Sequence, residues 1–242
     1  MNLATLRFRS EALGRQVTCT AVLPEPRHGP GPFPVLYQLH GRGGDHTGWV
    51  VQGRLVIHAA PYPLIVVCPD GAVSGWRNRS GSERYEDFVT QDLAAHVAAT
   101  FHVRPGPAAI GGLSMGGGGA LRLGLKHPDL YASVWGHSSA IFTGERLRAD
   151  GASEAEAEAD DLYAAAGRAV KAGSVPRLSF DCGVDDSLIE NNRAFHRHLE
   201  GIGLAHGYHE HPGAHTWAYW DAHVGAALRQ HAEVLGIRAD AG

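Results

Sequence analysis

A serine stands between two glycines in Gly112-Leu113-Ser114-Met115-Gly116, which matches the G-x-S-x-G pattern of a nucleophile elbow. An apolar run, Ala108–Leu113, precedes this serine and a helical pattern follows it to His127, which is the strand-to-helix context that the pattern requires. The sharp turn leaves no room for side chains at positions 112 and 116. The sequence therefore predicts Ser114 as a nucleophile at a helix N-terminus, where a developing negative charge is stabilised.

The helix that follows the elbow begins with four glycines, Gly116–Gly119. Each of them costs about 1 kcal/mol of helix stability relative to alanine. We expect close packing of this helix on the sheet to compensate for that cost.

A second glycine-rich loop, His40–Gly44, follows the apolar run Pro34–Leu39. In proteins with a nucleophile elbow, the loop after the strand that corresponds to Pro34–Leu39 supplies a backbone N–H to the oxyanion hole. The oxyanion hole binds the negatively charged oxygen of the tetrahedral intermediate. We assign the two donors to the backbone N–H groups of Arg42 and Met115. A phosphate-binding loop is the alternative, but no Lys-Ser/Thr follows and no G-x-G-x-x-G with a later acid is present.

The acid that orients a catalytic histidine should follow Ser114 in the chain and precede the histidine. The predicted strand Arg177–Cys182 ends in a loop that contains Asp185 and Asp186. An acid on that loop can reach an imidazole and hold its tautomer. Asp181 should still lie within the strand, so the choice stays open between Asp185 and Asp186.

His215 is the predicted general base. It lies in a loop directly after a predicted strand, in Pro212-Gly213-Ala214-His215-Thr216-Trp217, and such a loop can bring an imidazole to the elbow. Five other histidines that follow the acid are predicted on or beside that strand or in the last helix: His206, His209, His211, His223 and His231.

The chain contains 16 histidines, which raises the question of a metal site. His209-x-His211 and His196-x-His198 each place two imidazoles close in sequence, but no H-E-x-x-H or comparable ligand spacing accompanies them. We therefore expect no metal ion and no other cofactor. These histidines are expected to be solvated or hydrogen-bonded in the core.

Short apolar runs alternate with helical patterns along the chain, which predicts an α/β protein with a mostly parallel sheet covered on both faces. Together with the elbow, this indicates the α/β-hydrolase fold in a single domain, 1–242. The predicted strands are Leu3–Arg9, Gln16–Leu23, Pro34–Leu39, Leu64–Cys68, Ala108–Leu113, Tyr131–Gly136, Arg177–Cys182 and His206–His211. The predicted helices are Tyr85–His102, Met115–His127, Glu190–Ile202 and Trp217–Leu235.

The segment 139–167 interrupts the strand–helix alternation and contains the acidic run Ala152–Asp161. A solvated helix is the favoured interpretation, and a small cap over the site is the alternative. A cap this acidic offers little apolar surface, so we expect short acyl groups to be preferred. Four tryptophans are candidates for the pocket wall, with burial in the core as the alternative for each: Trp49, Trp76, Trp217 and Trp220.

Composition narrows the classes of partner. The formal net charge is −4 with no basic block, which argues against nucleic acid. No apolar run is long enough to span a membrane, and the N-terminus lacks the pattern of a signal peptide. Three widely spaced cysteines do not predict a disulfide framework, so we expect a cytoplasmic protein. The sequence leaves open whether the protein forms a homo-oligomer.

The chain resembles the putative esterase family, which includes esterase D/S-formylglutathione hydrolases, tributyrin esterases, feruloyl esterases and mycolyltransferases. The segments that carry the resemblance are Leu39-His40-Gly41, Pro69-Asp70-Gly71, Tyr85-Glu86-Asp87-Phe88, Gly112–Gly117, Cys182-Gly183-x-x-Asp186 and Pro212-Gly213-x-His215-x-Trp217. The resemblance implies that the acid is Asp186, the third residue after the glycine. It also supports the Arg42 N–H as the loop donor, and it is strongest to the small tributyrin esterases.

The predicted activity is hydrolysis of short-chain acyl esters by a serine carboxylesterase, through an acyl-enzyme on Ser114. One alternative is an acyltransferase or a thioesterase similar to S-formylglutathione hydrolases, with the same three side chains. The other is a binding module that has the fold without the activity.

Overall fold

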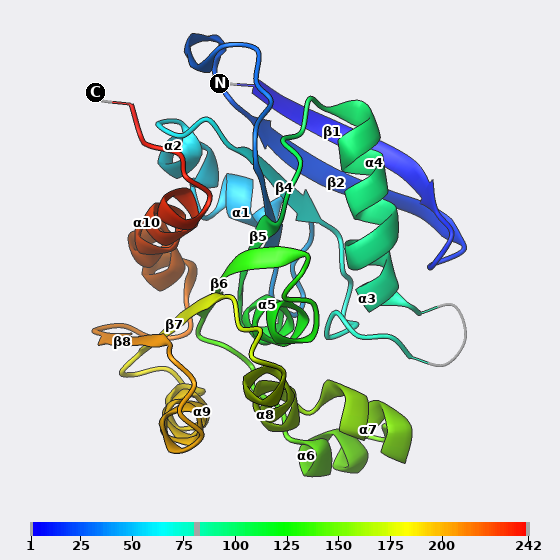
Figure 1. Ribbon diagram of the computed structural model, residues 1–242, viewed down its shortest axis with the longest axis vertical. Coiled ribbons are helices and arrows are strands. Elements are labelled where there is room, and N and C mark those ends of the chain that lie inside the picture. Colours follow the sequence, from blue (N-terminus) through cyan, green and yellow to red (C-terminus); the bar gives the residue numbers. More distant parts are fainter. Residues whose placement is uncertain (1, 80–82, 241–242) are drawn as a thin grey trace.

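The computed structural model describes residues 2–79 and 83–240 of the chain. Its centre is an eight-stranded sheet with the strand order β1-β2-β4-β3-β5-β6-β7-β8 (Figure 1). β1 pairs antiparallel with β2, and β2 pairs antiparallel with β4, whereas all further neighbours are parallel. The strands are β1 (Asn2–Ser10), β2 (Arg15–Leu23), β3 (Val35–Leu39), β4 (Ile65–Pro69), β5 (Ala108–Leu113), β6 (Tyr131–His137), β7 (Arg177–Gly183) and β8 (Gly207–His211).

All eight predicted strands are confirmed, and no predicted end differs from the observed end by more than one residue. Every residue of β3 and β4 is buried, because helices cover both faces of the sheet at its centre. β1 lies at the edge of the sheet, and its burial alternates along much of its length.

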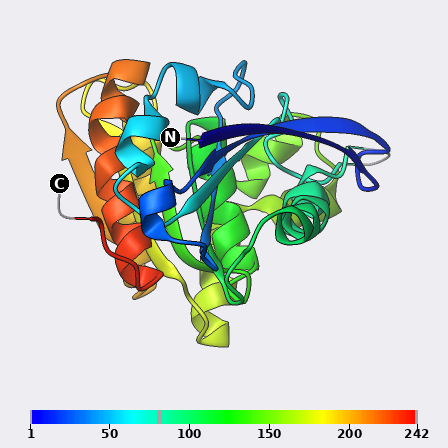
Figure 2. The same cartoon turned by 90° about the horizontal axis from the view of Figure 1, so that it is seen from above.

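Helices pack on both faces of the sheet and create two hydrophobic cores. α4, α5, α8 and α9 contribute to one core, and α1, α2 and α10 contribute to the other (Figures 1 and 2). The helices are α1 (Gly48–Val51), α2 (Leu55–Ala59), α3 (Tyr85–Asp87), α4 (Ala94–Thr100), α5 (Met115–Lys126), α6 (Gly144–Ala149), α7 (Glu154–Asp160), α8 (Leu162–Ala172), α9 (Ile189–Gly201) and α10 (Trp217–Val234).

The four predicted helices are present, and several unpredicted ones are added. The predicted helix Tyr85–His102 is α3 and α4 joined by a π-helical stretch, Phe88–Leu93. α1 and α2 were not predicted, because helices of four and five residues are too short to show a hydrophobic period. A 3₁₀ turn, Pro26–His28, lies between β2 and β3.

The segment 139–167 folds as α6, α7 and the first half of α8. The helix predicted for the acidic run Ala152–Asp161 is present as α7 and is mostly exposed, although Ala157 and Asp160 are buried. A capping box of Ser153 and Glu156 begins α7. At its other end, Asp160 is buried and lies 3.3 Å from Arg122 Nε and 3.5 Å from Lys126 Nζ, both in α5. Because these cations lie on the helix that carries the elbow, the acidic run is fixed to the body of the molecule.

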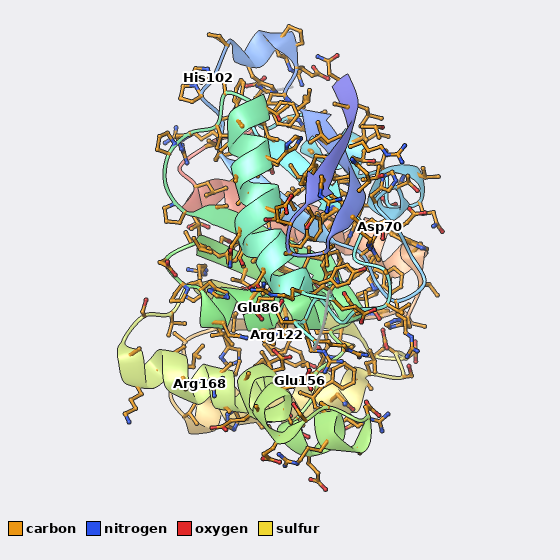
Figure 3. The ribbon with its side chains drawn as sticks, turned by 90° about the vertical axis from the view of Figure 1, so that its right-hand side faces the viewer. Asp70, Glu86, His102, Arg122, Glu156 and Arg168 are labelled. Carbon is orange, nitrogen blue, oxygen red and sulfur yellow. The ribbon has the colours of Figure 1, made fainter. Side chains whose placement is uncertain are left out.

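Glu86 of α3 belongs to the same group of charges. Its carboxylate lies 2.8 Å from Lys126 Nζ and 3.7 Å from Arg122 Nη2, and Figure 3 shows Glu86 and Arg122 close together near the lower end of the α3–α4 helix. Burial raises the pKa of Glu86, but a hydrogen bond from His127 and the two cations outweigh burial and lower it to about 2. The carboxylate is therefore ionised at neutral pH and links α3 to α5.

The glycines at the start of α5 allow this helix to touch backbone directly. A Cβ at Gly116 would lie 2.5 Å from the Leu39 carbonyl oxygen, and one at Gly117 would lie 2.9 Å from the His137 carbonyl oxygen. A Cβ at Gly118 would overlap the Ala140 carbonyl oxygen. Close packing of the helix, as expected, accounts for glycines that an exposed helix would not tolerate.

This packing predicts opposite effects for one substitution at two helical glycines. Gly118→Ala should lower the free energy of unfolding by about 1–3 kcal/mol, because the new methyl group cannot fit against Ala140. Gly167→Ala in α8 should raise it by about 0.5–1 kcal/mol, because apart from its chain neighbours and the nearby backbone of its own helix, no atom lies within 4 Å of the added Cβ. Urea unfolding of both variants measures the difference, and stabilisation of both would contradict the packing of α5.

Candidate active site

Ser114, His215 and Asp186 form a continuous chain of hydrogen bonds, although His215 lies 101 positions after Ser114 and 29 positions after Asp186. His215 Nε2 lies 2.9 Å from Ser114 Oγ, and His215 Nδ1 lies 2.8 Å from Asp186 Oδ2. With the proton on Nδ1 donated to the carboxylate, Nε2 can accept the hydrogen bond of the serine hydroxyl. This arrangement can take a proton from Ser114 and stabilise the resulting imidazolium.

The local backbone explains how Ser114 is presented. Its φ of 54° and ψ of −117° form a sharp turn between β5 and α5. The Ser114 N–H donates to the His137 carbonyl at 2.8 Å, and the Ser114 carbonyl accepts from Ala140 N–H at 2.9 Å. These bonds to β6 and the residues after it hold a backbone conformation that costs about 1–3 kcal/mol.

Asp186 lies in the turn after β7 with 2% of its surface exposed. Burial raises its pKa, but hydrogen bonds from His215, from the Leu188 N–H and from the Ser138 hydroxyl outweigh burial and hold the pKa below its usual value. Asp186 is therefore ionised at neutral pH. The neighbouring Asp185 is exposed, and its backbone N–H donates to the Gly213 carbonyl at 2.9 Å.

Asp181 lies within β7 as expected and belongs to a separate buried group. His137 Nδ1 lies 2.7 Å from its carboxylate, Trp135 Nε1 donates to it at 2.6 Å, and the Tyr219 hydroxyl donates to it at 2.8 Å. Sequence reasoning missed this cluster. The available signal was that His137 directly follows the predicted strand Tyr131–Gly136 and that Asp181 lies one residue before the end of the predicted strand Arg177–Cys182; the structure pairs these two residues in register.

A cavity of about 190 Å³ lies beside Ser114. The loop after β3 forms one side of it and the start of α10 forms the other. The lining residues are Gly41, Arg42, Gly43, Gly44, Gln52, Leu113, Ser114, His215, Trp217 and Trp220. None of these lining residues comes from the segment 139–167, so the segment considered as a possible cap does not line this cavity.

The four candidate tryptophans divide into two pairs. Trp217 and Trp220 line the cavity, and their rings meet edge-on with centroids 5.2 Å apart. Trp49 and Trp76 are fully buried behind the loop after β3, where their indole N–H groups donate to backbone carbonyls. The structure thus brings only the first pair to the cavity.

Both assigned oxyanion donors lie at the cavity or beside it. Arg42 is exposed in the lining loop, and Gly41 before it is so close to the elbow that a Cβ there would lie 3.2 Å from Ser114 Cβ. Met115 is the first residue of α5, so no carbonyl four residues earlier in the helix can accept its N–H.

Several of the remaining histidines contact one another. His196 Nδ1 lies 2.8 Å from His206 Nε2, and His211 stacks on His223 with ring centroids 4.1 Å apart. In residues 2–79 and 83–240, no group of three or more His, Cys, Asp or Glu side chains could hold a metal ion.

Comparison with known proteins identifies the class. Over almost the whole chain, the structure is similar to that of an S-formylglutathione hydrolase from Agrobacterium tumefaciens, with a TM-score of 0.85, 24% identity and coverage of 97% of this chain and 95% of the other. A fluorophosphonate-binding serine hydrolase from Staphylococcus aureus has a TM-score of 0.84 at 24% identity, covering 95% and 98% of the two chains. The protein therefore has the α/β-hydrolase fold, as predicted.

The family follows from the sequence itself. The family model described as Putative esterase matches residues 10–231, so the chain belongs to this esterase family. An acetyl esterase from Caldicellulosiruptor saccharolyticus is 26% identical over 258 residues, which cover 94% of this chain and 97% of the relative. The protein is accordingly a carboxylic ester hydrolase, and the predicted enzyme class is confirmed.

The geometry predicts that substitutions of the two adjacent aspartates, Asp185 and Asp186, have different effects on kcat. Asp186→Asn should lower kcat by up to about 10⁴-fold, because an amide at this position favours the wrong imidazole tautomer. Asp185→Asn should change kcat little, since its side chain is exposed and the Asp186 carboxylate alone contacts His215. Steady-state kinetics with p-nitrophenyl acetate provides the measurement, and a larger loss for Asp185→Asn would refute the assignment.

Proposed function

We propose that the enzyme is a serine carboxylesterase in which Ser114 is the nucleophile, His215 the general base and Asp186 the acid of a catalytic triad. The observation that carries the proposal is the unbroken hydrogen-bond chain from Ser114 Oγ through His215 to Asp186. The low pKa of Asp186 supports it, because an ionised carboxylate stabilises the imidazolium that forms during attack.

The reaction then follows in two half-reactions. Ser114 Oγ attacks the ester carbonyl while His215 Nε2 takes its proton, and the tetrahedral intermediate places its negative oxygen toward the N–H groups of Arg42 and Met115. His215 returns the proton to the departing alcohol, which leaves an acyl-enzyme. Water attacks that ester with His215 again as base, and the acid product leaves.

Ser114→Ala should abolish ester hydrolysis, since no other group takes the place of the attacking oxygen. We expect kcat to fall by several orders of magnitude and covalent labelling by a fluorophosphonate probe to disappear, with unfolding by urea nearly unchanged. Ser174→Ala, which removes an exposed hydroxyl far along the chain, is the matched control and should keep both activity and labelling. Residual activity above about 1% of wild type would exclude Ser114 as nucleophile.

The small volume of the cavity supports a preference for substrates with short acyl groups. Its volume of about 190 Å³ is below the range of about 300–1,000 Å³ that is usual for sites of drug-sized ligands, and two indole rings bound it. The segment 139–167 adds no apolar wall that would extend it. The relative named as an acetyl esterase agrees with this preference.

Across p-nitrophenyl esters of increasing acyl length, kcat/KM should therefore peak between acetyl and butyryl. Each methylene that fits gains about 0.8 kcal/mol, and the rate falls once the cavity is full. Trp217→Ala should move the maximum to longer chains, because it removes one wall, whereas Trp135→Ala, which does not line the cavity, should not. A wild-type maximum at about ten carbons or more would contradict the small pocket.

We further propose that residues 1–242 form one domain and that the enzyme works in the cytoplasm. All the strands of the described residues join one sheet, which supports a single domain. Cys19, Cys68 and Cys182 are free and buried, which suits a reducing compartment. Among the described helices, none is long and apolar enough to cross a membrane.

A further inference from the structure

We propose that Trp49, Trp76 and His40 are positioning residues that hold the oxyanion loop in its working geometry. Each donates a side-chain hydrogen bond to one of three successive backbone carbonyls at the beginning of that loop. The inference rests on the function proposed above, in which the Arg42 N–H of the loop binds the oxyanion.

The three hydrogen bonds come from different parts of the chain and meet on one short stretch of backbone. Trp49 Nε1 donates to the Leu39 carbonyl at 2.9 Å, and Trp76 Nε1 donates to the His40 carbonyl at 3.2 Å. His40 Nδ1 lies 2.7 Å from the Gly41 carbonyl oxygen. All three donor side chains are 1% exposed or less, so water cannot replace any of these bonds.

The hydrogen bond of His40 sets the direction of the proposed oxyanion donor. His40 Nε2 accepts the Gly71 N–H at 2.8 Å, so the imidazole proton lies on Nδ1 and is donated to the Gly41 carbonyl. The Gly41 carbonyl and the Arg42 N–H belong to the same peptide group, which is planar and trans. Fixing the carbonyl therefore fixes the direction of the N–H.

The two indole bonds control the distance between the loop and the elbow. A Cβ at Gly116 would lie 2.5 Å from the Leu39 oxygen and 2.6 Å from the His40 oxygen, so these two carbonyls touch the start of α5. If either carbonyl turned, the loop would shift relative to the Met115 N–H. The two N–H groups must converge on one oxygen, and a displacement of about 1 Å can cost about 100-fold in rate.

The backbone at Trp76 shows that this ring is held in place at a conformational cost. Trp76 has a φ of 59°, a left-handed conformation that is unfavourable for a bulky residue. Its carbonyl accepts a hydrogen bond from Arg122 of α5, and its N–H donates to the Ser74 hydroxyl at 2.9 Å. These hydrogen bonds hold the backbone conformation from which the indole N–H reaches the His40 carbonyl.

The test replaces each tryptophan with phenylalanine, which keeps an aromatic ring and removes the N–H. Trp49→Phe and Trp76→Phe should each lower kcat for p-nitrophenyl acetate about 10- to 100-fold with little change in KM. A short alkyl boronic acid forms a tetrahedral adduct with the serine, and its affinity should fall by the same factor as kcat. Both effects arise because the loop serves the transition state and not the ground state.

Trp135→Phe is the matched control. Its indole N–H is also buried and hydrogen-bonded, but to the Asp181 carboxylate and not to the loop. This variant should lose stability to a similar extent and keep kcat and boronic acid affinity within about twofold of wild type. Unchanged kcat in Trp49→Phe and Trp76→Phe, or an equal loss in Trp135→Phe, would overturn the positioning role.

Two further measurements keep the outcomes distinct. If the variants do not fold, hydrogen exchange of the indole N–H groups is measured in the wild-type enzyme instead. The indole N–H groups of Trp49 and Trp76 should exchange slowly, and that of Trp217 should exchange quickly. Rapid exchange at Trp49 and Trp76 would overturn the proposal. Activity that survives in Ser114→Ala would instead reject the proposed triad. Tryptophan variants with full kcat in an enzyme that needs Ser114 would reject the positioning role alone.

Discussion

The Leu39 and His40 carbonyl oxygens lie where a side chain at position 116 would begin, 2.5 and 2.6 Å from such a Cβ. This contact between two backbones sets the distance between the loop after β3 and the elbow after β5. β3 and β5 are neighbours in the sheet, with Leu39 paired to Gly112. The sheet therefore brings the two segments together, and the absence of a side chain at Gly116 allows them to touch.

Much of the fold and of the candidate site could be predicted, because both depend on local pattern. β3 to β7 appear as short apolar runs, and Ser114 stands in a motif whose glycines have steric reasons that the structure makes visible. His215 could be chosen by its place in a loop after a strand. Residue chemistry alone could not separate Asp186 from Asp185, since the decision depends on which side of one tight turn faces the imidazole; the family resemblance was needed.

Other features could not be predicted because their partners are distant in the chain or belong to the backbone. Trp49 and Trp76 were candidates for the pocket wall, yet their indole groups face carbonyls 10 and 36 positions away. A sequence pattern does not show which carbonyl a buried indole will reach. The burial of Asp160 was hidden for a similar reason, because an acidic run looks solvated until the cations of α5 are placed beside it.

The distribution of the five tryptophans gives the enzyme a built-in optical reporter. Trp49, Trp76, Trp135 and Trp220 are buried, whereas Trp217 is partly exposed at the cavity. The rings of Trp49 and Trp220 lie 5.6 and 5.2 Å from that of Trp217, close enough for excitation energy to pass between them. Emission from this group should respond to whatever occupies the cavity, so substrate entry can be followed by intrinsic fluorescence without a label.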